Sequence, residues 1–287
     1  MTFPRLLYQV WFQGTNDPSF SAIVRENTEA WKRMNPTWRH HVVDQHRLRQ
    51  ACRSISPETE ACFLRLAHIH IILAIDFGRY CLLYQTGGMY VDTDMWCIRP
   101  VDACTALQQQ ITQDKPFVAV CQANPSLSHV VNNGMMVSTP GHPFLRHFIL
   151  DIQKKVTDHR ADKEIRLKEW FIIHCAGPLN LSKQLRIFQK NDQHANTVIL
   201  YFPFDVFEAS VDRQLFRVTD QTIALHVREG SWISSDGIKG LAADMIINMV
   251  SIPTILMTCP VLSLVLLLVG ILIGVLLVRT FRHRVKR

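Results

Sequence analysis

The chain has 287 residues, 48% of them hydrophobic, which is enough apolar material for a folded core and excludes a disordered protein. The formal net charge is +7, but five basic residues fall within positions 279–287, so residues 1–278 carry only about +2 (7 minus 5). Because this excess is confined to a tail, the charge does not predict binding to nucleic acid.

Apolar runs rich in β-branched and aromatic residues alternate with helical patterns along residues 1–245. Residues 1–14 lack the features of a signal peptide, and they predict a first strand. Such alternation is typical of an α/β domain with a largely parallel sheet, and residues 1–245 are predicted to form one domain. Strands are predicted at 6–12, 40–44, 88–92, 117–121, 135–138, 196–202 and 222–227, and helices at 20–34, 58–85, 143–157, 163–172 and 179–190.

Two aspartates, Asp92 and Asp94, close the predicted strand that follows the glycine pair Gly87 and Gly88. In a regular strand the two carboxylates would point to opposite faces, so the strand must end or kink between them. That brings both to one site beyond the carboxyl end of the strand, where α/β sheets bind ligands. Paired carboxylates suit Mg²⁺ or Mn²⁺, which also bind the oxygens of a diphosphate. The alternative is a solvated Asp-Thr-Asp turn.

Asp76 and Arg79 precede this pair at helical spacing and share one helix face. They form either a plain surface ion pair or a held guanidinium that meets a sugar or a phosphate.

The segment 245–278 contains no ionisable side chain apart from one cysteine, and residues 254–278 are long enough to cross ~30 Å of hydrocarbon as a helix. We therefore predict a single-pass membrane helix at 254–278, a link to it at 234–244 and a basic tail at 279–287. A buried hairpin broken at Pro253 and Pro260 is the alternative. The orientation stays open, because the tail favours a cytoplasmic C-terminus while the missing signal peptide favours a cytoplasmic folded domain.

Seven cysteines precede this segment, and none of them forms a C-x-x-C pair. The sequence therefore predicts neither a zinc site nor a disulfide framework. It predicts that these cysteines are buried free thiols.

The stretch "DFGRYCLLYQTGGMYVDTD" resembles the D-x-x-R-(Y)-x-x-L-x-x-x-G-G-x-Y-x-D-x-D segment of glycosyltransferase family 32, the DXD sugar-binding enzymes. Four further pieces agree in order across roughly residues 3–233. They are "PRLLYQVW", "AWKRMNPTWRHHVVD", "NNGMMVSTPGHPFL" and "HVREGSW". Two positions depart from the family pattern, Tyr8 where the family has His and Ala176 where it has Thr.

This resemblance implies a GT-A fold, which is Rossmann-like, and sugar transfer from a nucleotide donor with retained anomeric configuration. The catalytic residues that it implies are Asp76, Arg79, Asp92, Asp94 and Asn133. The implied metal ligands are Asp92, Asp94 and His226. The implied nucleotide-sugar contacts are Gln9, Trp11, Asp76, Arg79, Asp92, Asn133, Ser231 and Trp232.

Several of these residues also have a structural interpretation. Trp11 and Trp232 are alternatively core aromatic residues. His226 on its apolar strand is alternatively a hydrogen-bonded core histidine, and Asn133 a turn cap.

Within the family, the apolar C-terminal segment most resembles that of the inositol phosphoceramide mannosyltransferases. This likeness implies Mn²⁺ (or Mg²⁺), GDP-mannose as donor, a membrane glycolipid such as inositol phosphoceramide as acceptor, and an endomembrane location, the Golgi. No second carboxylate is placed as a nucleophile, so front-face attack is expected. The alternatives are transfer to protein-linked glycans from GDP-mannose or a UDP-hexose, a catalytically weak membrane-tethered sugar-binding module, and a metal-dependent phosphohydrolase.

Overall fold

The computed structural model describes residues 3–113, 115–123, 130–158, 168–190, 196–209 and 218–227. All of them belong to one compact unit, Met1–Gly230. The predicted link 234–244, the segment 254–278, the tail 279–287 and the domain boundary at 245 lie outside these residues and stay predictions. Within the part of the chain that is described, no helix is both long and apolar enough to cross a membrane.

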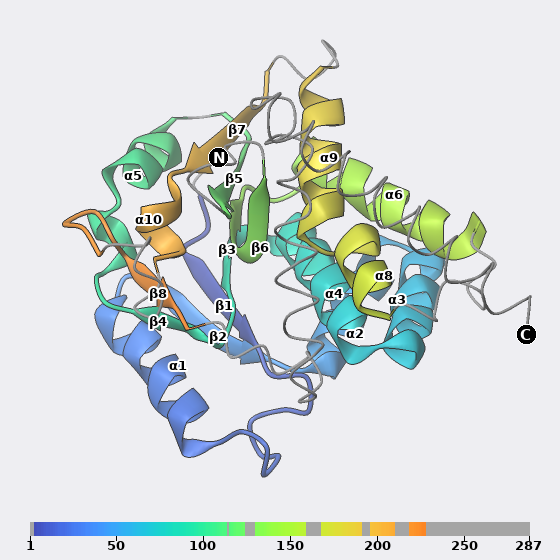
Figure 1. Cartoon of the computed structure of the whole chain (residues 1–287), viewed down its shortest axis with the longest axis horizontal. Coiled ribbons are helices and arrows are strands. Elements are labelled where there is room, and N and C mark those ends of the chain that lie inside the picture. The colour runs from blue at the N-terminus through green and yellow to red at the C-terminus, as the bar shows by residue number, and fades with distance from the viewer. Residues whose placement is uncertain are drawn as a thin grey trace, which may run out of the picture. The chain divides into compact units, whose positions relative to one another are not determined.

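A six-stranded sheet forms the centre of this unit (Figure 1). Its spatial order is β2 (Arg39–Val43), β1 (Leu6–Val10), β3 (Gly88–Val91), β6 (Val131–Ser138), β5 (Phe117–Gln122) and β7 (Val198–Phe202). The short strands β4 (Met95–Cys97) and β8 (Ala224–His226) pair antiparallel as a second sheet. The predicted α/β class is confirmed.

Helices cover both faces of the large sheet (Figure 1). On one side lie α1 (Ala22–Met34), α5 (Thr105–Thr112) and α10 (Phe204–Phe207). On the other lie α2 (Gln45–Ile55), α3 (Pro57–Ile69), α4 (Ile71–Thr86), α6 (Pro143–Asp158), α8 (Lys168–Cys175) and α9 (Pro178–Gln189). A 3₁₀ turn, η1 (Val101–Ala103), precedes α5.

The prediction of a largely parallel sheet is wrong for the middle of the sheet. Strands β2, β1 and β3 are parallel to one another, and β5 is parallel to β7, but β6 runs antiparallel to both of its neighbours. The sequence pattern is the same for both directions because β6 is buried on both faces along residues 133–138. Since β1, β2 and β3 are parallel, their carboxyl ends meet at one edge of the sheet.

The single helix predicted at 58–85 is in fact two helices, α3 and α4, separated at His70. This residue has extended backbone angles, φ −163° and ψ 137°, and its Nδ1 accepts a hydrogen bond from the backbone N–H of Ile72. The imidazole therefore caps α4 in place of the Ser, Asp or Asn that usually marks a helix start. The helices α2, α5 and α10 and the strand β4 were not predicted at all.

The glycine pair between α4 and β3 has the conformations that only glycine adopts readily. Gly87 and Gly88 have φ values of 65° and 101°, and a Cβ on Gly88 would lie 2.5 Å from the carbonyl oxygen of Leu6. These conformations deliver β3 directly from the end of α4 into the sheet.

The seven cysteines of the described residues are buried thiols outside any disulfide, as predicted. They are Cys52, Cys62, Cys81, Cys97, Cys104, Cys121 and Cys175.

Candidate active site

Asp92 and Asp94 follow the end of β3 at the edge where β1, β2 and β3 all terminate. The strand stops at Val91, and the N–H of Met95 bonds the carbonyl of Asp92 at 3.2 Å, which closes a tight turn. Both carboxylates thereby reach one side of the sheet edge. The predicted break between the two aspartates is confirmed.

Side chains from α1 and β1 hold the backbone of this turn. Asn27 donates its amide N–H groups to the carbonyls of Thr93 (2.7 Å) and Met95 (2.9 Å), and the indole of Trp31 donates to the same Met95 carbonyl at 2.6 Å. The amide of Gln9 donates to the carbonyl of Asp92 at 3.4 Å. The turn is therefore anchored by buried donors, and its geometry does not depend on the aspartate side chains alone.

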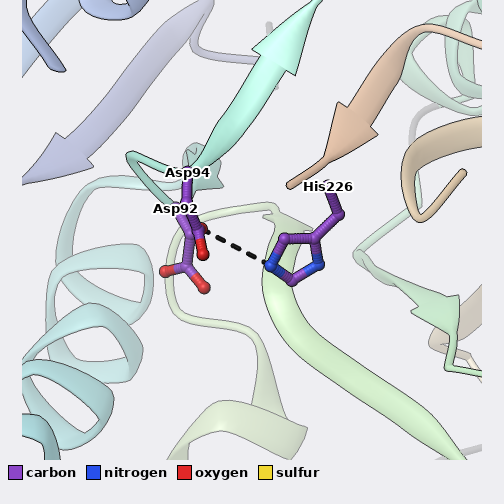
Figure 2. Close-up of side chains that lie close together, drawn as sticks. All are labelled: Asp92, Asp94 and His226. Carbon is purple, nitrogen blue, oxygen red and sulfur yellow. Dashed lines mark ion pairs between the residues drawn. The ribbon is translucent and has the colours of Figure 1, made fainter. Parts of the chain in front are cut away.

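His226 reaches the same place from the far end of the described chain. Strand β8 pairs with β4 so that His226 lies opposite Met95, and the N–H of Val227 bonds the carbonyl of Asp94 at 3.0 Å. Ligand atoms of Asp92, Asp94 and His226 all lie within 4.8 Å of one another (Figure 2). We call these three residues the DXD cluster.

The DXD cluster concentrates negative charge around one imidazole. Burial raises the pKa of Asp92, Arg79 lowers it, and the neighbouring Asp94 carboxylate raises it again. Burial lowers the pKa of His226, but the carboxylates of Glu208 and Asp94 outweigh this effect and raise it to about 10. In the absence of a cation the imidazolium provides part of the compensating positive charge, with Nε2 3.4 Å from Asp94 Oδ1.

A second group of polar side chains lies beside the DXD cluster, and we call Asp76, Arg79 and Asn133 the Arg79 cluster. The guanidinium of Arg79 pairs with Asp76 at 2.8 Å and with Asp92 at 3.2 Å, and it donates to the carbonyl of Asn133 at 2.7 Å. It also lies over the ring of Tyr90, 4.3 Å from the centroid. The side chains of Asp76 and Arg79 are only 6% and 5% exposed, so the pair is buried and is not a surface ion pair.

Asn133 and two tyrosines complete the hydrogen-bond network of the Arg79 cluster. Asn133 donates to Asp76 Oδ1 at 3.0 Å and to the hydroxyl of Tyr80 at 2.9 Å, and Tyr80 in turn donates to the carbonyl of Ala176 at 2.7 Å. The hydroxyl of Tyr90 donates to Asp92. Because Ala176 takes part through its backbone, its side chain is not part of this network.

A bulge in β6 places Asn133 within this network. Consecutive residues Val120 and Cys121 of β5 pair with Met136 and Asn132 of β6, so residues 133–135 form a bulge opposite β5, while Met135 still pairs with Val91 of β3. Asn133 therefore lies within a strand, not in a turn. Burial raises the pKa of Asp76 to about 7, although Arg79 opposes this.

The remaining predicted contacts are placed as follows. Gln9 is fully buried, and its amide oxygen bonds His40 Nε2 at 2.9 Å. It therefore links β2 to the turn formed by residues 92–95, which we call the DXD turn. Trp11 follows β1, is partly exposed, bonds Ser19 through its indole nitrogen at 3.2 Å and packs edge-on against Phe20. Their predicted nucleoside contacts stay predictions. Ser231 and Trp232 lie outside the described residues.

Sequence reasoning missed Asn27, Asn132 and Glu208, which support the site from outside it. Asn27 lies on the buried stripe of α1 at spacing i, i+4 with Trp31, which is a weak signal. Glu208 follows a short apolar run, and no pattern in that run distinguishes it.

The comparisons with known proteins agree with this geometry. Residues 21–118 match the family model described as "Glycosyltransferase sugar-binding region containing DXD motif", and this range includes Asp76, Arg79, Asp92 and Asp94.

Two curated relatives are mannosyltransferases. The chain is 27% identical over 171 residues to the initiation-specific alpha-1,6-mannosyltransferase of Candida albicans, covering 54% of this chain and 43% of the relative. It is 26% identical over 187 residues to inositol phosphoceramide mannosyltransferase 1 of Schizosaccharomyces pombe, covering 63% and 50%. The matches thus span about half the length of these relatives or less.

Among solved structures, PaToxG Glycosyltransferase is similar with a TM-score of 0.48 and 14% identity, covering 66% of this chain and 70% of that one. The resemblance carried by the motifs is confirmed: residues 21–118 match the DXD-type sugar-binding region of glycosyltransferases, and the two curated relatives are mannosyltransferases.

Proposed function

We propose that this protein is a GT-A-type, divalent-metal-dependent retaining glycosyltransferase that transfers mannose from GDP-mannose to a membrane glycolipid. The observation that carries the proposal is the meeting of Asp92, Asp94 and His226 within 4.8 Å at the carboxyl edge of the parallel strands. Asp92 and Asp94 come from a turn that is anchored by Asn27 and Trp31, and His226 comes from β8.

The donor set fits a divalent cation. Two carboxylates and one imidazole would hold it, and an imidazole ligand favours Mn²⁺ over Mg²⁺, which prefers oxygen donors. When bound, such an ion supplies Lewis-acid stabilisation and neutralises the charge of a departing diphosphate. The side chains of Asp92 and Asp94 are 27% and 26% exposed, so both are accessible from solvent.

The Arg79 cluster holds the site in shape in this proposal. Arg79 fixes one oxygen of Asp92 and, through the carbonyl of Asn133, the bulge of β6. Asp76 keeps the guanidinium in place, and its other partner is the amide of Asn133. Direct contact of these three residues with the donor sugar is part of the proposal.

The carboxylates near the site also bear on the reaction class. Double displacement requires a carboxylate that can attack the sugar, but Asp76 is buried against Arg79, and Glu208 is fully buried against His226. With Asp92 and Asp94 assigned to the ion, none of the carboxylates described at this site is placed as a nucleophile. Front-face attack by the acceptor hydroxyl is the retaining route consistent with this arrangement.

A cavity at the same edge of the sheet has room for a nucleoside. Its volume is about 310 Å³, and its lining comes from β1, β2 and the segments that follow them. Tyr8 lies in register between His41 on β2 and Tyr90 on β3, so the cavity beside His41 is two strand spacings, roughly 10 Å, from the strand that carries Asp92. A ribose and a diphosphate can span this separation. The lining residues are Tyr8, Gly14, Thr15, His41, Val42, Val43, Asp44 and Arg47.

Donor and acceptor rest on the relatives and on the sequence. The two relatives described above are mannosyltransferases, and one of them acts on inositol phosphoceramide by its name. The apolar segment 254–278 and the basic residues after it suit an acceptor in an anionic membrane. An endomembrane, Golgi location is part of the same proposal.

The test is release of nucleoside diphosphate by the full chain in detergent with Mn²⁺. GDP-mannose, UDP-galactose and UDP-glucose are compared, each with and without inositol phosphoceramide. We expect Mn²⁺-dependent GDP release that the lipid stimulates, and its loss in the Asp92→Ala/Asp94→Ala variant. Glu58→Gln, which changes an exposed carboxylate at the start of α3, is the matched control and should retain activity.

Other results would point to other functions. Folded protein that is silent with every donor would refute transfer and favour a sugar-binding module. Metal-dependent phosphate release from substrates without sugar would favour a phosphohydrolase.

A further inference from the structure

Glu208 follows α10 and is fully buried, yet it carries a carboxylate. Its Oε2 lies 2.7 Å from Nδ1 of His226 and 2.9 Å from the amide nitrogen of Asn132. Taking a carboxylate out of water costs several kcal/mol unless partners compensate it, so packing alone does not account for a glutamate at this position.

The backbone around Glu208 fixes its position relative to His226. The N–H of Ile223 bonds the carbonyl of Val206 at 2.7 Å, and the N–H of His226 bonds the carbonyl of Ala209 at 2.8 Å. Hydrogen bonds on both sides of Glu208 therefore connect its segment to β8. The carboxylate and the imidazole are held face to face by main-chain contacts that do not depend on either side chain.

We propose that Glu208 is a positioning residue of the metal site, which accepts the Nδ1–H of His226 and so directs Nε2 toward Asp92 and Asp94. This inference rests on the metal-dependent function proposed above. Figure 2 shows the ring with one nitrogen turned to Asp94 and the other turned away; these are Nε2, 3.4 Å from Asp94, and Nδ1, 2.7 Å from Glu208. A histidine that ligates a metal through one nitrogen generally donates its other N–H to a carboxylate or a carbonyl, which fixes the tautomer.

Asn132 completes the arrangement. Its amide nitrogen holds Glu208, while its amide oxygen accepts the backbone N–H of Asn133 at 2.8 Å. The bulge of β6 that places Asn133 beside Arg79 thus also orients the carboxylate behind His226. One strand irregularity supports both halves of the site.

The test is a titration of the full chain with Mn²⁺ alone. The concentration of free Mn²⁺ is measured at each step by electron paramagnetic resonance. Neither a sugar donor nor an acceptor is present, so the readout is independent of transferase activity. We expect Glu208→Ala to weaken Mn²⁺ binding by about 10- to 100-fold. Glu208→Gln should weaken it less, because its amide oxygen can accept the same two hydrogen bonds.

A double-mutant cycle with His226 separates positioning from other effects. If Glu208 acts through the imidazole, Glu208→Ala should change Mn²⁺ affinity by less than about twofold in a His226→Ala background. Phe207→Leu, a truncation of the adjacent buried residue, controls for loss of packing and should leave Mn²⁺ affinity unchanged. An equal loss in both backgrounds, or wild-type affinity in Glu208→Ala, would overturn the proposal.

A second measurement decides the question if Glu208→Ala does not fold. The ¹⁵N resonances of His226 in the wild-type chain saturated with diamagnetic Mg²⁺ should show a protonated Nδ1 and an unprotonated Nε2. The opposite tautomer would refute the role of Glu208. Absence of any Mn²⁺ binding by the wild-type chain would refute the metal site itself, and this inference with it.

Discussion

The DXD cluster and the Arg79 cluster are joined by the contact between Asp92 and Arg79, yet their charges are stabilised differently. In the Arg79 cluster, Asp76 and Arg79 are almost fully buried, and each charge faces a partner at hydrogen-bond distance. In the DXD cluster, the side chains of Asp92 and Asp94 are each about a quarter exposed, and their two negative charges repel each other.

This difference separates a part of the protein whose charges are matched by its own residues from a part that can bind a cation. A buried charge must be matched within the protein, because removal of one partner leaves an ion without solvent. Like charges gathered at a partly exposed edge are tolerable because solvent screens them, and a cation relieves their repulsion further. Substitutions in the two clusters should therefore have different effects on stability, even where both abolish turnover.

The largest effect is expected from Arg79→Met, which removes the only charge that the structure shows paired with Asp76 among the described residues. The free energy of unfolding should fall by about 3–5 kcal/mol, because Asp76 loses its buried ion-pair partner and must either stay charged without compensation or take up a proton. Denaturant unfolding at pH 7 measures it. The double variant Asp76→Asn/Arg79→Met should recover part of the loss. A single variant within about 0.5 kcal/mol of wild type would contradict the matched-charge interpretation.

Asp94→Asn tests the other cluster. Turnover should fall by about 100-fold or more, because several kcal/mol of charge stabilisation depend on the ion. The metal-free protein should change in stability by less than about 1 kcal/mol, since the lost attraction to His226 and the lost repulsion from Asp92 oppose each other at a partly exposed site.

Thermal unfolding with and without Mn²⁺ checks this second prediction. The wild type should gain stability as Mn²⁺ is added, and Asp94→Asn should not. Glu58→Gln should behave as the wild type does. An equal gain in Asp94→Asn would show that the stabilising ion binds elsewhere.

Much of the DXD cluster was predictable from the sequence because its signals are local. Gly87 and Gly88 mark a turn, an apolar run marks β3, and the alternation of side chains along a strand requires a break between Asp92 and Asp94. The imidazole of His226 required the family motif, since a histidine on an apolar strand is not distinctive by itself.

The rest depends on contacts between distant parts of the chain. The antiparallel direction of β6 follows from its place between β3 and β5, which a buried apolar run does not encode. The separation of α3 from α4 at His70 is not marked in the sequence by a Gly or a Pro. Glu208 acquires its role only when β8 packs beside α10, so no spacing in the sequence connects it to His226.

Gly134→Ala should have a smaller effect, confined to the DXD cluster. A Cβ at this position would lie 3.0 Å from Asp92 Oδ2 and 3.5 Å from His226 Cε1, so the carboxylate must shift by a few tenths of an ångström. Mn²⁺ affinity should fall about tenfold, as when second-layer groups of a metal site are disturbed. Gly78→Ala crowds Leu48 at 3.0 Å on α2 and is the matched control. Gly78→Ala should lower the free energy of unfolding and leave Mn²⁺ affinity unchanged. Equal Mn²⁺ affinity in Gly134→Ala and Gly78→Ala would show that crowding of Asp92 does not affect the metal site.

The smallest effect is a pH dependence that arises beneath the DXD turn, where His40 bonds the amide oxygen of Gln9. Burial lowers the pKa of His40 to about 4, so between about pH 6.5 and pH 4 the unfolded chain binds a proton that the folded chain does not. Stability should therefore fall as the pH decreases, by about 1 kcal/mol between pH 7 and pH 5.5. His40→Gln does not titrate and can still donate to Gln9, so denaturant unfolding at the two pH values should show a difference smaller by that amount. Every other group titrates equally in both proteins. An identical pH dependence would therefore mean that His40 is not held neutral in the folded protein. It would also mean that the support of the DXD turn by Gln9 does not depend on the protonation state of His40.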